Sequence, residues 1–462
     1  MTLIKSISGI RGTIGGKPSE NLTPIDAVKF AAAYGTWLKK RNGAGNVKVV
    51  VGRDARISGE MIQQLVMNTL VGLGLEIVDV GLSTTPTVEI AVSLEKAEGG
   101  IILTASHNPK QWNALKLLNE KGEFLSGEDG AEILEIAEAA DFDFSEVESL
   151  GQITEVSHYI DTHIEQVLKL PLVDEKMISE AGLTVAVDAV NSTGGIAMPR
   201  LLKKLGVKVI ELYCEPTGHF PHNPEPLKEH LTEISELVKR EKADLGVVVD
   251  PDVDRLAFIS EDGEMFGEEY TLVACADYVL GKTPGNTVSN LSSSRALRDI
   301  TEKHGGEYKA SAVGEVNVVQ LMKDSKAVIG GEGNGGIIYP ELHYGRDSLV
   351  GVALFLTYLA EKKMKVSELR KSYPAYFMSK NKIELSPGLN VDQILEQVEQ
   401  NYASEEISTI DGVKIDFADH WIHLRKSNTE PIIRIYTEAK SQKQADEAAE
   451  SMISEIKRIA GL

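Results

Sequence analysis

The repeated succession of a short β-branched run and an amphipathic helix constrains the fold of this chain more than any other feature. Such alternation builds parallel sheets that carry helices on both faces. Strands are predicted at residues 47–51, 100–103, 183–187, 207–212 and 245–249, and helices at 59–73, 131–140, 270–280 and 348–360. The proline-rich stretch 216–226 is predicted to be a loop, because proline interrupts both helices and sheets.

The pattern changes after Tyr373-Pro374. Residues 378–385, 413–417, 421–424 and 432–436 alternate in the manner of antiparallel strands, and residues 442–459 have the period of a closing helix. The end of the chain is therefore expected to be a separate α+β unit. At 462 residues, and about 150 residues per domain, the chain has room for three to four domains.

Composition excludes several classes of function. The chain carries 48 Lys and Arg against 69 Asp and Glu, and the resulting formal charge of −21 repels nucleic acid and anionic membranes. Cys214 and Cys275 are the only cysteines, too few for a disulfide framework or a cysteine zinc site. No run of about 18 apolar residues occurs, and the first residues lack the apolar stretch of a signal peptide. We expect a cytoplasmic protein with no nucleic-acid or membrane partner.

The stretch 99–109, Gly-Gly-Ile-Ile-Leu-Thr-Ala-Ser-His-Asn-Pro, is a strand of the buried type that ends in a polar loop. Ligands bind where parallel strands end, so Ser106 and His107 are candidates for chemistry, although Ser, Asn and Pro also form ordinary turns. A Ser–His nucleophile pair is disfavoured, because neighbours in an extended segment point to opposite sides. Another group would then have to activate or modify the Ser106 hydroxyl.

Three carboxylates, Asp250, Asp252 and Asp254, follow the strand 245–249 at alternate positions. In a bent loop this spacing brings all three onto one hard divalent cation, which we favour over a solvated acidic turn. An EF-hand is excluded, because the position that must be glycine is Arg255. An aspartyl-phosphate phosphatase with Asp250 as nucleophile would need a second acidic metal motif downstream, and the sequence contains none that we recognise.

Three glycines, Gly331, Gly333 and Gly336, match the dinucleotide-binding pattern G-x-G-x-x-G. The next residues, Ile-Ile-Tyr-Pro, are β-branched and proline-bearing and do not suit the start of a helix, so the pattern is a weak indication. A polar loop that presents Glu332 and Asn334 to sugar hydroxyls fits as well, and so does a plain flexible loop.

A compact anion cradle is predicted between two strands of the last unit, at Arg425, Ser427, Asn428 and Thr429. A guanidinium, two hydroxyls and turn amides within five residues suit a phosphate group. Such a cluster is more notable in an acidic chain than in a basic one. Further cationic or polar support is expected from residues elsewhere in the chain: Arg11, Arg53, Arg56 and Lys116.

Taken together and in this order, these four stretches resemble the α-D-phosphohexomutase superfamily (phosphoglucomutase, phosphomannomutase and phosphoglucosamine mutase) over essentially the whole chain. The resemblance implies an α/β fold of four domains around a central cleft: three related α/β domains with mixed sheets and a C-terminal α+β domain. We place them at residues 1–152, 153–250, 251–368 and 369–462. They would carry the phosphoserine loop (104–109), the metal loop (250–254), the sugar loop (331–336) and the phosphate loop (425–429).

The resemblance also implies a reaction. In the superfamily the loop serine, here Ser106, carries a phosphoryl group and donates it to a sugar monophosphate. A hexose 1,6-bisphosphate forms, turns around without leaving, and returns its other phosphate to the serine. Mg²⁺ would be held by Ser106, Asp250, Asp252 and Asp254, and would offset charge that repels an anionic substrate.

Further roles follow residue by residue from the same resemblance. Lys116 and Arg255 are candidates for proton transfer and phosphoryl stabilisation, and Arg11 for contact with the phosphoryl group. The sugar would be bound by Glu332 and Asn334. The phosphate that is not reacting would be held by residues of the last domain: Arg425, Ser427, Asn428 and Thr429.

The substrate is indicated by departures from the superfamily pattern. Many relatives carry Gly-Glu-x-Ser-Gly-His in the sugar loop, whereas Asn334 and Gly336 stand here for the serine and histidine. Glu315 stands where phosphomannomutase/phosphoglucomutase enzymes have a histidine. This form looks more like the archaeal-type phosphoglucosamine mutase branch, so we favour glucosamine phosphate over glucose or mannose phosphate.

Two further expectations concern class and assembly. A sugar-phosphate binding protein without turnover would keep the cradle at 425–429 and would need neither Ser106 nor the three aspartates. We expect a monomer or a homodimer.

Overall fold

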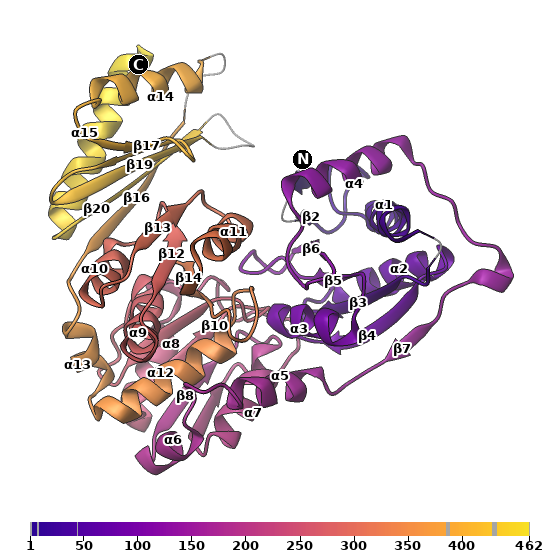
Figure 1. The fold of residues 1–462 in the computed structure, drawn as a ribbon, viewed down its shortest axis with the longest axis horizontal. Coiled ribbons are helices and arrows are strands. Elements are labelled where there is room, and N and C mark those ends of the chain that lie inside the picture. Colours follow the sequence, from indigo (N-terminus) through magenta and orange to yellow (C-terminus); the bar gives the residue numbers. More distant parts are fainter. Residues whose placement is uncertain (1, 7–8, 44, 385–388, 427–431, 462) are drawn as a thin grey trace.

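Four sheets follow one another along the chain, each the centre of its own unit (Figure 1). The structure is a computed structural model that describes residues 2–6, 9–43, 45–384, 389–426 and 432–461. The first three sheets mix parallel and antiparallel strands, and all pairings of the fourth are antiparallel. The predicted α/β class, with three related units and a C-terminal α+β unit, is confirmed.

The first unit has a seven-stranded sheet with the order β1-β2-β6-β5-β3-β4-β7. Its strands are β1 (Ile4–Ser6), β2 (Gly9–Thr13), β3 (Lys48–Arg53), β4 (Glu76–Leu82), β5 (Gly99–Leu103), β6 (Trp112–Leu118) and β7 (Ile153–Glu155). Its helices are α1 (Pro24–Asn42), α2 (Gly59–Gly72), α3 (Thr85–Glu95), α4 (Gly127–Ala139) and the 3-10 turn η1 (Val147–Ser149).

The strand β3 shows why its sequence is β-branched throughout. Val49 and Val51 pack into the core under α1 and α2, whereas Val50 packs into the core under α3. Successive side chains of a strand point to opposite faces, so both faces of β3 are buried. The predicted strand at 47–51 and helix at 59–73 are confirmed to within two residues at each end.

The second and third units each have a four-stranded sheet, with the orders β11-β10-β8-β9 and β13-β12-β14-β15. The second unit contains α5 (Tyr159–Leu168), α6 (Glu175–Ala181), β8 (Thr184–Asp188), α7 (Gly194–Lys204), β9 (Lys208–Leu212), η2 (Lys228–His230), α8 (Thr232–Glu241), β10 (Leu245–Val249) and β11 (Leu256–Ser260). The third contains α9 (Glu268–Lys282), β12 (Asn286–Asn290), α10 (Arg295–Lys303), β13 (Tyr308–Ser311), α11 (Glu315–Ser325), β14 (Ala327–Glu332), β15 (Gly336–Ile338) and α12 (Ser348–Lys362).

One arrangement of elements recurs in the first three units. The succession strand, helix, strand, helix, strand, strand occurs as β3 to β6, β8 to β11 and β12 to β15. If the four strands of the succession are counted along the chain, their order across each of the three sheets is fourth, third, first, second. The last two strands always form an antiparallel pair: β5 with β6, β10 with β11, and β14 with β15. The loops that join these pairs carry the serine, aspartate and glycine motifs, which therefore occupy equivalent places in three related folds.

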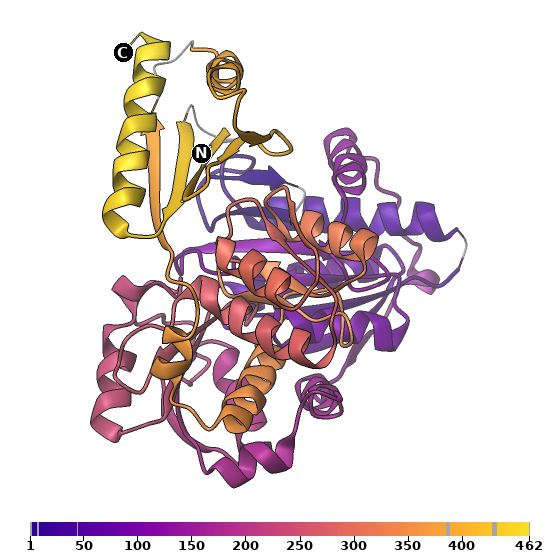
Figure 2. The same ribbon diagram turned by 60° about the vertical axis from the view of Figure 1, so that its left-hand side comes forward.

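The fourth unit is an antiparallel sheet with the order β16-β20-β19-β18-β17. Its elements are α13 (Val366–Lys371), β16 (Phe377–Glu384), α14 (Val391–Asn401), β17 (Glu406–Ser408), β18 (Val413–Asp416), β19 (His420–Lys426), β20 (Ile432–Ala439) and α15 (Gln442–Ala460). Figure 2 shows α15 lying along one face of this sheet. The predicted strands and closing helix of this unit are confirmed.

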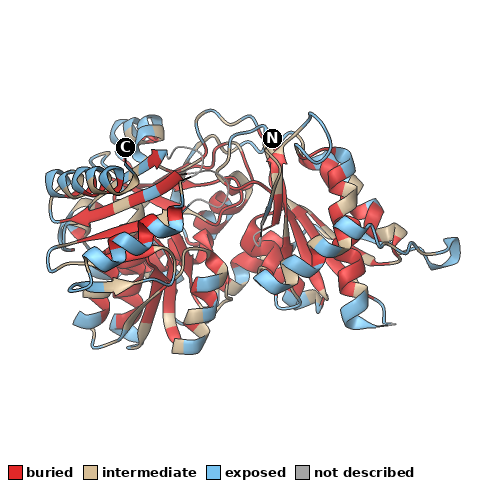
Figure 3. Cartoon of the chain, turned by 90° about the horizontal axis from the view of Figure 1, so that it is seen from above, coloured by how far each residue is buried: buried red, intermediate tan, exposed pale blue. Residues whose placement is uncertain are grey.

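Buried residues fill the interior of each unit (Figure 3). The second and third units share one hydrophobic core, and α12 runs through it with every residue from 348 to 360 buried. Phe258 of β11 stacks on Phe355 of α12 with ring centroids 3.9 Å apart. The first and fourth units have cores of their own. Within the described part of the chain, no helix is long and apolar enough to cross a membrane.

The sheets extend slightly past the domain boundaries proposed from the sequence. β7 pairs with β4 of the first sheet, and β11 pairs with β10 of the second, because each sheet ends in an added edge strand. The third boundary, after residue 368, falls inside α13. We keep the four proposed domains and place their boundaries after β7, β11 and α13.

Candidate active site

The loop between β5 and β6 presents Ser106 in a left-handed conformation, with a φ of 47°. This conformation is uncommon for a residue other than glycine and marks a turn that its surroundings enforce. The backbone N–H of Ser106 donates to Thr104 Oγ1 at 3.0 Å, and Thr104 Oγ1 donates to the buried Asp54 at 2.7 Å. The expectation of an extended segment is wrong here, because the turn brings Ser106 Oγ within 3.4 Å of His107 Nδ1.

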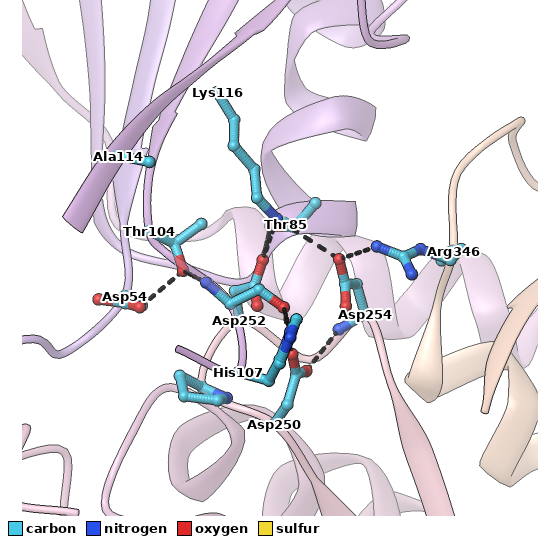
Figure 4. A network of polar contacts seen from close by, with 12 residues as sticks. Asp54, Thr85, Thr104, His107, Ala114, Lys116, Asp250, Asp252, Asp254 and Arg346 are labelled. Carbon is cyan, nitrogen blue, oxygen red and sulfur yellow. Dashed lines mark hydrogen bonds and ion pairs between the residues drawn. The ribbon is translucent and has the colours of Figure 1, made fainter. Parts of the chain in front are cut away.

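The serine hydroxyl nevertheless has a better partner than the histidine. Ser106 Oγ donates to Asp250 Oδ2 at 2.7 Å, across the boundary between the first and second units. Figure 4 shows Asp250 in one network of polar contacts with Asp252 and Asp254. Burial and the nearby charge of Arg255 lower the pKa of His107 far below its usual value, so its imidazole is neutral. The arrangement favours a serine that faces carboxylates over a Ser–His pair.

A single arginine, Arg56, holds the serine loop in shape. Its Nη1 donates to the carbonyls of Pro109 and Trp112, and its Nη2 to those of Ser106 and Asn108. Its Nε donates to Asp54 at 2.9 Å, so all five N–H groups of the guanidinium are used. The sequence suggested Arg56 as support for a phosphate. It is a positioning residue instead, because its donors are already occupied by the protein.

The three aspartates lie in the loop between β10 and β11, and each is fully buried. The loop bends sharply at Val253, whose φ of 66° is strained for a β-branched residue. The bend directs the carboxylates of Asp250, Asp252 and Asp254 to one place, where their ligand atoms lie within 4.8 Å of one another. Burial and the two neighbouring carboxylates raise the pKa of Asp250 well above its usual value.

The donors around the aspartates leave free oxygens for a cation. Lys116 Nζ donates to Asp252 Oδ2 at 2.8 Å, and Thr85 also donates to this oxygen. Arg346 Nη2 donates to Asp254 Oδ2 at 2.7 Å. The other oxygens, Asp252 Oδ1 and Asp254 Oδ1, are buried without a hydrogen-bond partner. Buried unpaired carboxylate oxygens are costly, and the donor set fits a hard divalent cation.

Positive charge gathers beside this cluster from three units. Burial lowers the pKa of Arg11, and the charges of Arg434 and Arg255 lower it further, so these guanidinium groups are close enough to repel one another. The Nε atoms of Arg11 and Arg255 are buried without a hydrogen-bond partner. Arg255 is also ion-paired with Glu225 at 3.2 Å. Unpaired donors and mutual repulsion together indicate a site for an anion.

Lys116 completes the cationic side of the site from β6. Its Nζ lies 2.8 Å from Asp252 Oδ2 and 3.5 Å from Asp254 Oδ2. Burial lowers the pKa of Lys116, but the two carboxylates outweigh burial and raise it above its usual value. The amine is therefore charged at neutral pH and suits phosphoryl stabilisation better than proton abstraction.

The glycine motif forms a β-hairpin between β14 and β15. Gly331 has a φ of 154° and a Cβ there would meet Gly336 O at 2.0 Å, so the close approach of the two strands requires glycine. A strand and not a helix follows the motif, which excludes the dinucleotide alternative. Asn334 Oδ1 accepts the backbone N–H of Gly336 at 3.2 Å and closes the turn.

Glu332 is buried at the end of β14 and both of its oxygens accept hydrogen bonds. Oε1 accepts from Asn290 Nδ2 at 2.8 Å and from the backbone N–H of Gly314 at 3.3 Å. Oε2 accepts from Arg346 Nη1 at 2.9 Å. Arg346 also contacts Glu315, so two carboxylates of the third unit meet one guanidinium.

The predicted phosphate loop is described only in part. Arg425 lies at the end of β19 and its Nε is 2.8 Å from Asp411 Oδ2. Ser427, Asn428 and Thr429 lie outside the described residues. Sequence reasoning did not single out Arg346 or Thr85, because their contacts with the aspartates arise only when separate units dock.

The chain matches four domain families in order. Residues 3–144 match phosphoglucomutase/phosphomannomutase alpha/beta/alpha domain I, residues 157–263 match domain II, and residues 267–376 match domain III. Residues 361–455 match the phosphoglucomutase/phosphomannomutase C-terminal domain.

Similar proteins extend over nearly the whole chain. The phosphoglucomutase/phosphomannomutase of Thermococcus kodakarensis is 37% identical over 445 residues, covering 95% of this chain and 96% of that protein. The phosphoglucosamine/phosphogalactosamine mutase of Sulfurisphaera tokodaii is 33% identical over 458 residues, covering 98% and 97%. The solved structure of a phosphoglucomutase/phosphomannomutase family protein from Burkholderia thailandensis has a TM-score of 0.84 at 24% identity, covering 99% of this chain and 98% of that chain.

Proposed function

This chain belongs to the phosphoglucomutase/phosphomannomutase family, and we propose that it is a magnesium-dependent phosphohexomutase that interconverts glucosamine 6-phosphate and glucosamine 1-phosphate. One observation carries the proposal. The hydroxyl of Ser106 is hydrogen-bonded to Asp250 within a buried cluster of three aspartates that retains unpaired oxygens. A binding protein without turnover would have no need of this arrangement.

In the proposed reaction Ser106 carries the phosphoryl group. The bond between its Oγ and phosphorus breaks as a sugar hydroxyl forms a new bond to phosphorus, and the proton of that hydroxyl ends on the Ser106 oxygen. The resulting hexose 1,6-bisphosphate turns around, and the reverse transfer restores the phosphoserine. Lys116, Arg11 and Arg255 stabilise the negative charge of the transferring group. The unpaired Nε donors of Arg11 and Arg255 support this role, and so does the positively charged amine of Lys116 beside Asp252.

The metal proposed for this site is Mg²⁺, held by Asp250, Asp252, Asp254 and Ser106. When bound, the cation supplies Lewis-acid polarisation of the phosphoryl oxygens and offsets the charge of the three carboxylates. Lys116, Thr85 and Arg346 hold the Oδ2 atoms, and this leaves the Oδ1 atoms of Asp252 and Asp254 available.

The sugar is proposed to lie against Glu332 and Asn334, with its distant phosphate on Arg425, Ser427, Asn428 and Thr429. Glu332 and Glu315 place two carboxylates beside one another in the third unit, around Arg346. The two carboxylates outnumber the one guanidinium between them, and a protonated 2-amino group would be attracted to the remaining negative charge more than a hydroxyl would, which supports glucosamine phosphate. The likeness to the Thermococcus kodakarensis protein supports the alternative, a phosphoglucomutase/phosphomannomutase acting on glucose or mannose phosphate.

A side-by-side comparison of wild-type enzyme with glucosamine, glucose and mannose 1-phosphates tests the proposal. We expect Mg²⁺-dependent turnover with the highest kcat/KM for glucosamine phosphate. A higher value for glucose or mannose phosphate would favour the alternative, and binding without turnover of any of them would leave only a sugar-phosphate binding protein. We further propose a cytoplasmic enzyme that works as a monomer or homodimer.

A further inference from the structure

Arg346 lies between β15 and α12 and its guanidinium contacts three carboxylates. Nη2 donates to Asp254 Oδ2 at 2.7 Å, Nη1 to Glu332 Oε2 at 2.9 Å, and Nε to Glu315 Oε2 at 3.1 Å. The backbone N–H of Arg346 also donates to Glu315, at 2.9 Å. The side chain is only 9% exposed. One buried cation therefore joins the aspartate loop of the second unit to the hairpin of the third.

At the sugar end, Arg346 fixes the direction of Glu332. Asn290 and Gly314 hold Oε1 with neutral donors, and Arg346 supplies the charged donor to Oε2. In the described part of the chain, Arg346 is the ion-pair partner of the Glu332 carboxylate. A buried carboxylate without such a partner would lose its charge or its orientation.

At the metal end, Arg346 is the nearer of two cations that contact Oδ2 of Asp254, since Lys116 Nζ lies 3.5 Å from the same oxygen. The two cations occupy Oδ2, and Oδ1 remains buried without a partner. The planar fork of a guanidinium fixes both acceptors at once, which the single ammonium of a lysine cannot do. Asp254 and Glu332 are therefore held in a fixed relation to each other.

The backbone behind Arg346 is anchored from three units. Asp347 Oδ2 lies 2.8 Å from His163 Nε2 and 3.3 Å from His343 Nε2, and Asp347 Oδ1 accepts from the start of α12. His163 Nδ1 in turn lies 2.9 Å from Thr87 Oγ1 of α3. Because His163 belongs to the second unit and Thr87 to the first, this buried junction leaves Arg346 little freedom to move.

We propose that Arg346 is a positioning residue that couples sugar recognition to the metal cluster: the hydrogen bonds that hold Glu332 for the sugar also hold Asp254 for the cation. This inference rests on the proposed mutase activity. It predicts that the contribution of Glu332 to turnover depends on Arg346, because Glu332 is correctly aligned only while the guanidinium holds it.

A double-mutant cycle tests this coupling, with Arg346→Gln, Glu332→Gln, the double variant and wild type. We expect Glu332→Gln to lower kcat/KM for glucosamine phosphate at least about tenfold more in the wild-type background than in the Arg346→Gln background. A tenfold difference corresponds to a coupling free energy of about 1.4 kcal/mol. If kcat/KM of the double variant falls by the product of the two factors measured in the single variants, the two residues act independently and the proposal is overturned.

Two further variants separate positioning from a merely structural role. Arg346→Lys keeps the charge and supports folding, but an ammonium cannot bridge both carboxylates, so the loss of coupling should persist. Wild-type kinetics in Arg346→Lys would overturn the proposal. The same cycle is run with Arg346→Lys if Arg346→Gln does not fold. Arg200→Gln, which removes an exposed ion pair with Asp161, is the control and should leave the kinetics unchanged.

A failure of the proposed function is distinguishable from a failure of this inference. If the wild-type enzyme turns over and the cycle is additive, only the role of Arg346 is refuted. If the wild type binds glucosamine 6-phosphate but turns over none of the three hexose phosphates, the mutase is refuted, and the cycle measured as Kd by calorimetry decides the coupling by the same criterion. If the wild type neither turns over nor binds, both proposals are refuted.

Discussion

Arg56 offers the sharpest test of how the serine loop is held. Its five N–H groups serve one carboxylate and four backbone carbonyls, those of Ser106, Asn108, Pro109 and Trp112. The ring centroid of Phe220, in the second unit, lies 5.1 Å from Arg56 Cζ. Replacement by lysine keeps the positive charge beside Asp54 but offers only three N–H donors.

The magnitude follows from the number of bonds that lysine cannot make. At least two of the five acceptors lose their donor, and at about 1.5 kcal/mol for a hydrogen bond with a charged donor the loss is about 3 kcal/mol. If the loss distorts the serine loop and raises the activation free energy of turnover by the same amount, kcat falls about 100-fold, since about 1.36 kcal/mol corresponds to a factor of ten. KM should change little, because Arg56 has no donor left for the substrate.

The assay measures kcat and KM for glucosamine phosphate in Arg56→Lys, with thermal unfolding followed in parallel. Arg53→Lys is the matched control. The sequence also suggested Arg53 as support for a phosphate, but within the described residues its partly exposed guanidinium donates to Gln63 and to the carbonyl of Asp54. A kcat for Arg56→Lys equal to that of the Arg53→Lys control would refute the role assigned to Arg56.

Three other perturbations have defined outcomes. Asp252→Asn should raise the Mg²⁺ concentration needed for activity. It should also lower kcat at least about 100-fold with KM nearly constant, because the cation acts on the transferring group. An unchanged Mg²⁺ requirement would contradict this. Glu332→Gln should lower kcat/KM for glucosamine phosphate several-fold more than for glucose phosphate, because a charge-assisted hydrogen bond is worth roughly 1.5–3 kcal/mol against about 1 kcal/mol for a neutral one. Equal losses for the two substrates would show that Glu332 does not bind the 2-amino group. Burial raises the pKa of Glu89 from 4.5 to about 8. Burial lowers the pKa of His343, but its hydrogen bonds to Asp347 and Glu89 outweigh burial and raise this pKa from 6.5 to about 10. In the folded chain these two groups therefore hold more protons than in the unfolded chain between pH 6.5 and 10, and their contribution should make Tm fall as the pH rises through this window. The slope should be shallower in Glu89→Gln, and an identical slope would count against the assignment.

The parts of the fold that the sequence predicted are those governed by local pattern. The β-branched run at 245–249 becomes β10, with Val247 and Val249 in one core and Val248 in another, because a strand covered on both faces has no polar face. The serine and aspartate motifs were also recognisable, since each follows a buried strand directly.

Other parts depend on docking between units and leave no local signal. Arg346 and Thr85 reach the aspartates only because three units meet, and sequence spacing does not encode such a meeting. The left-handed turn at Ser106 is imposed by Thr104 and Arg56, so the extended conformation assumed for this residue was wrong. The catalytic and binding roles proposed for the site residues stay predictions, and for Ser427, Asn428 and Thr429, which lie outside the described residues, their positions do as well.

The central claim is that Ser106 carries the phosphoryl group, and intact-mass analysis tests it most directly. Wild-type protein incubated with glucose 1,6-bisphosphate and Mg²⁺ should gain the mass of one phosphoryl group, and peptide mapping should place it on Ser106. Ser106→Ala should fold normally, gain no mass and show no turnover, because a loop hydroxyl contributes little to the core. A phosphoryl group on another residue, or turnover by Ser106→Ala at the wild-type rate, would contradict the mechanism.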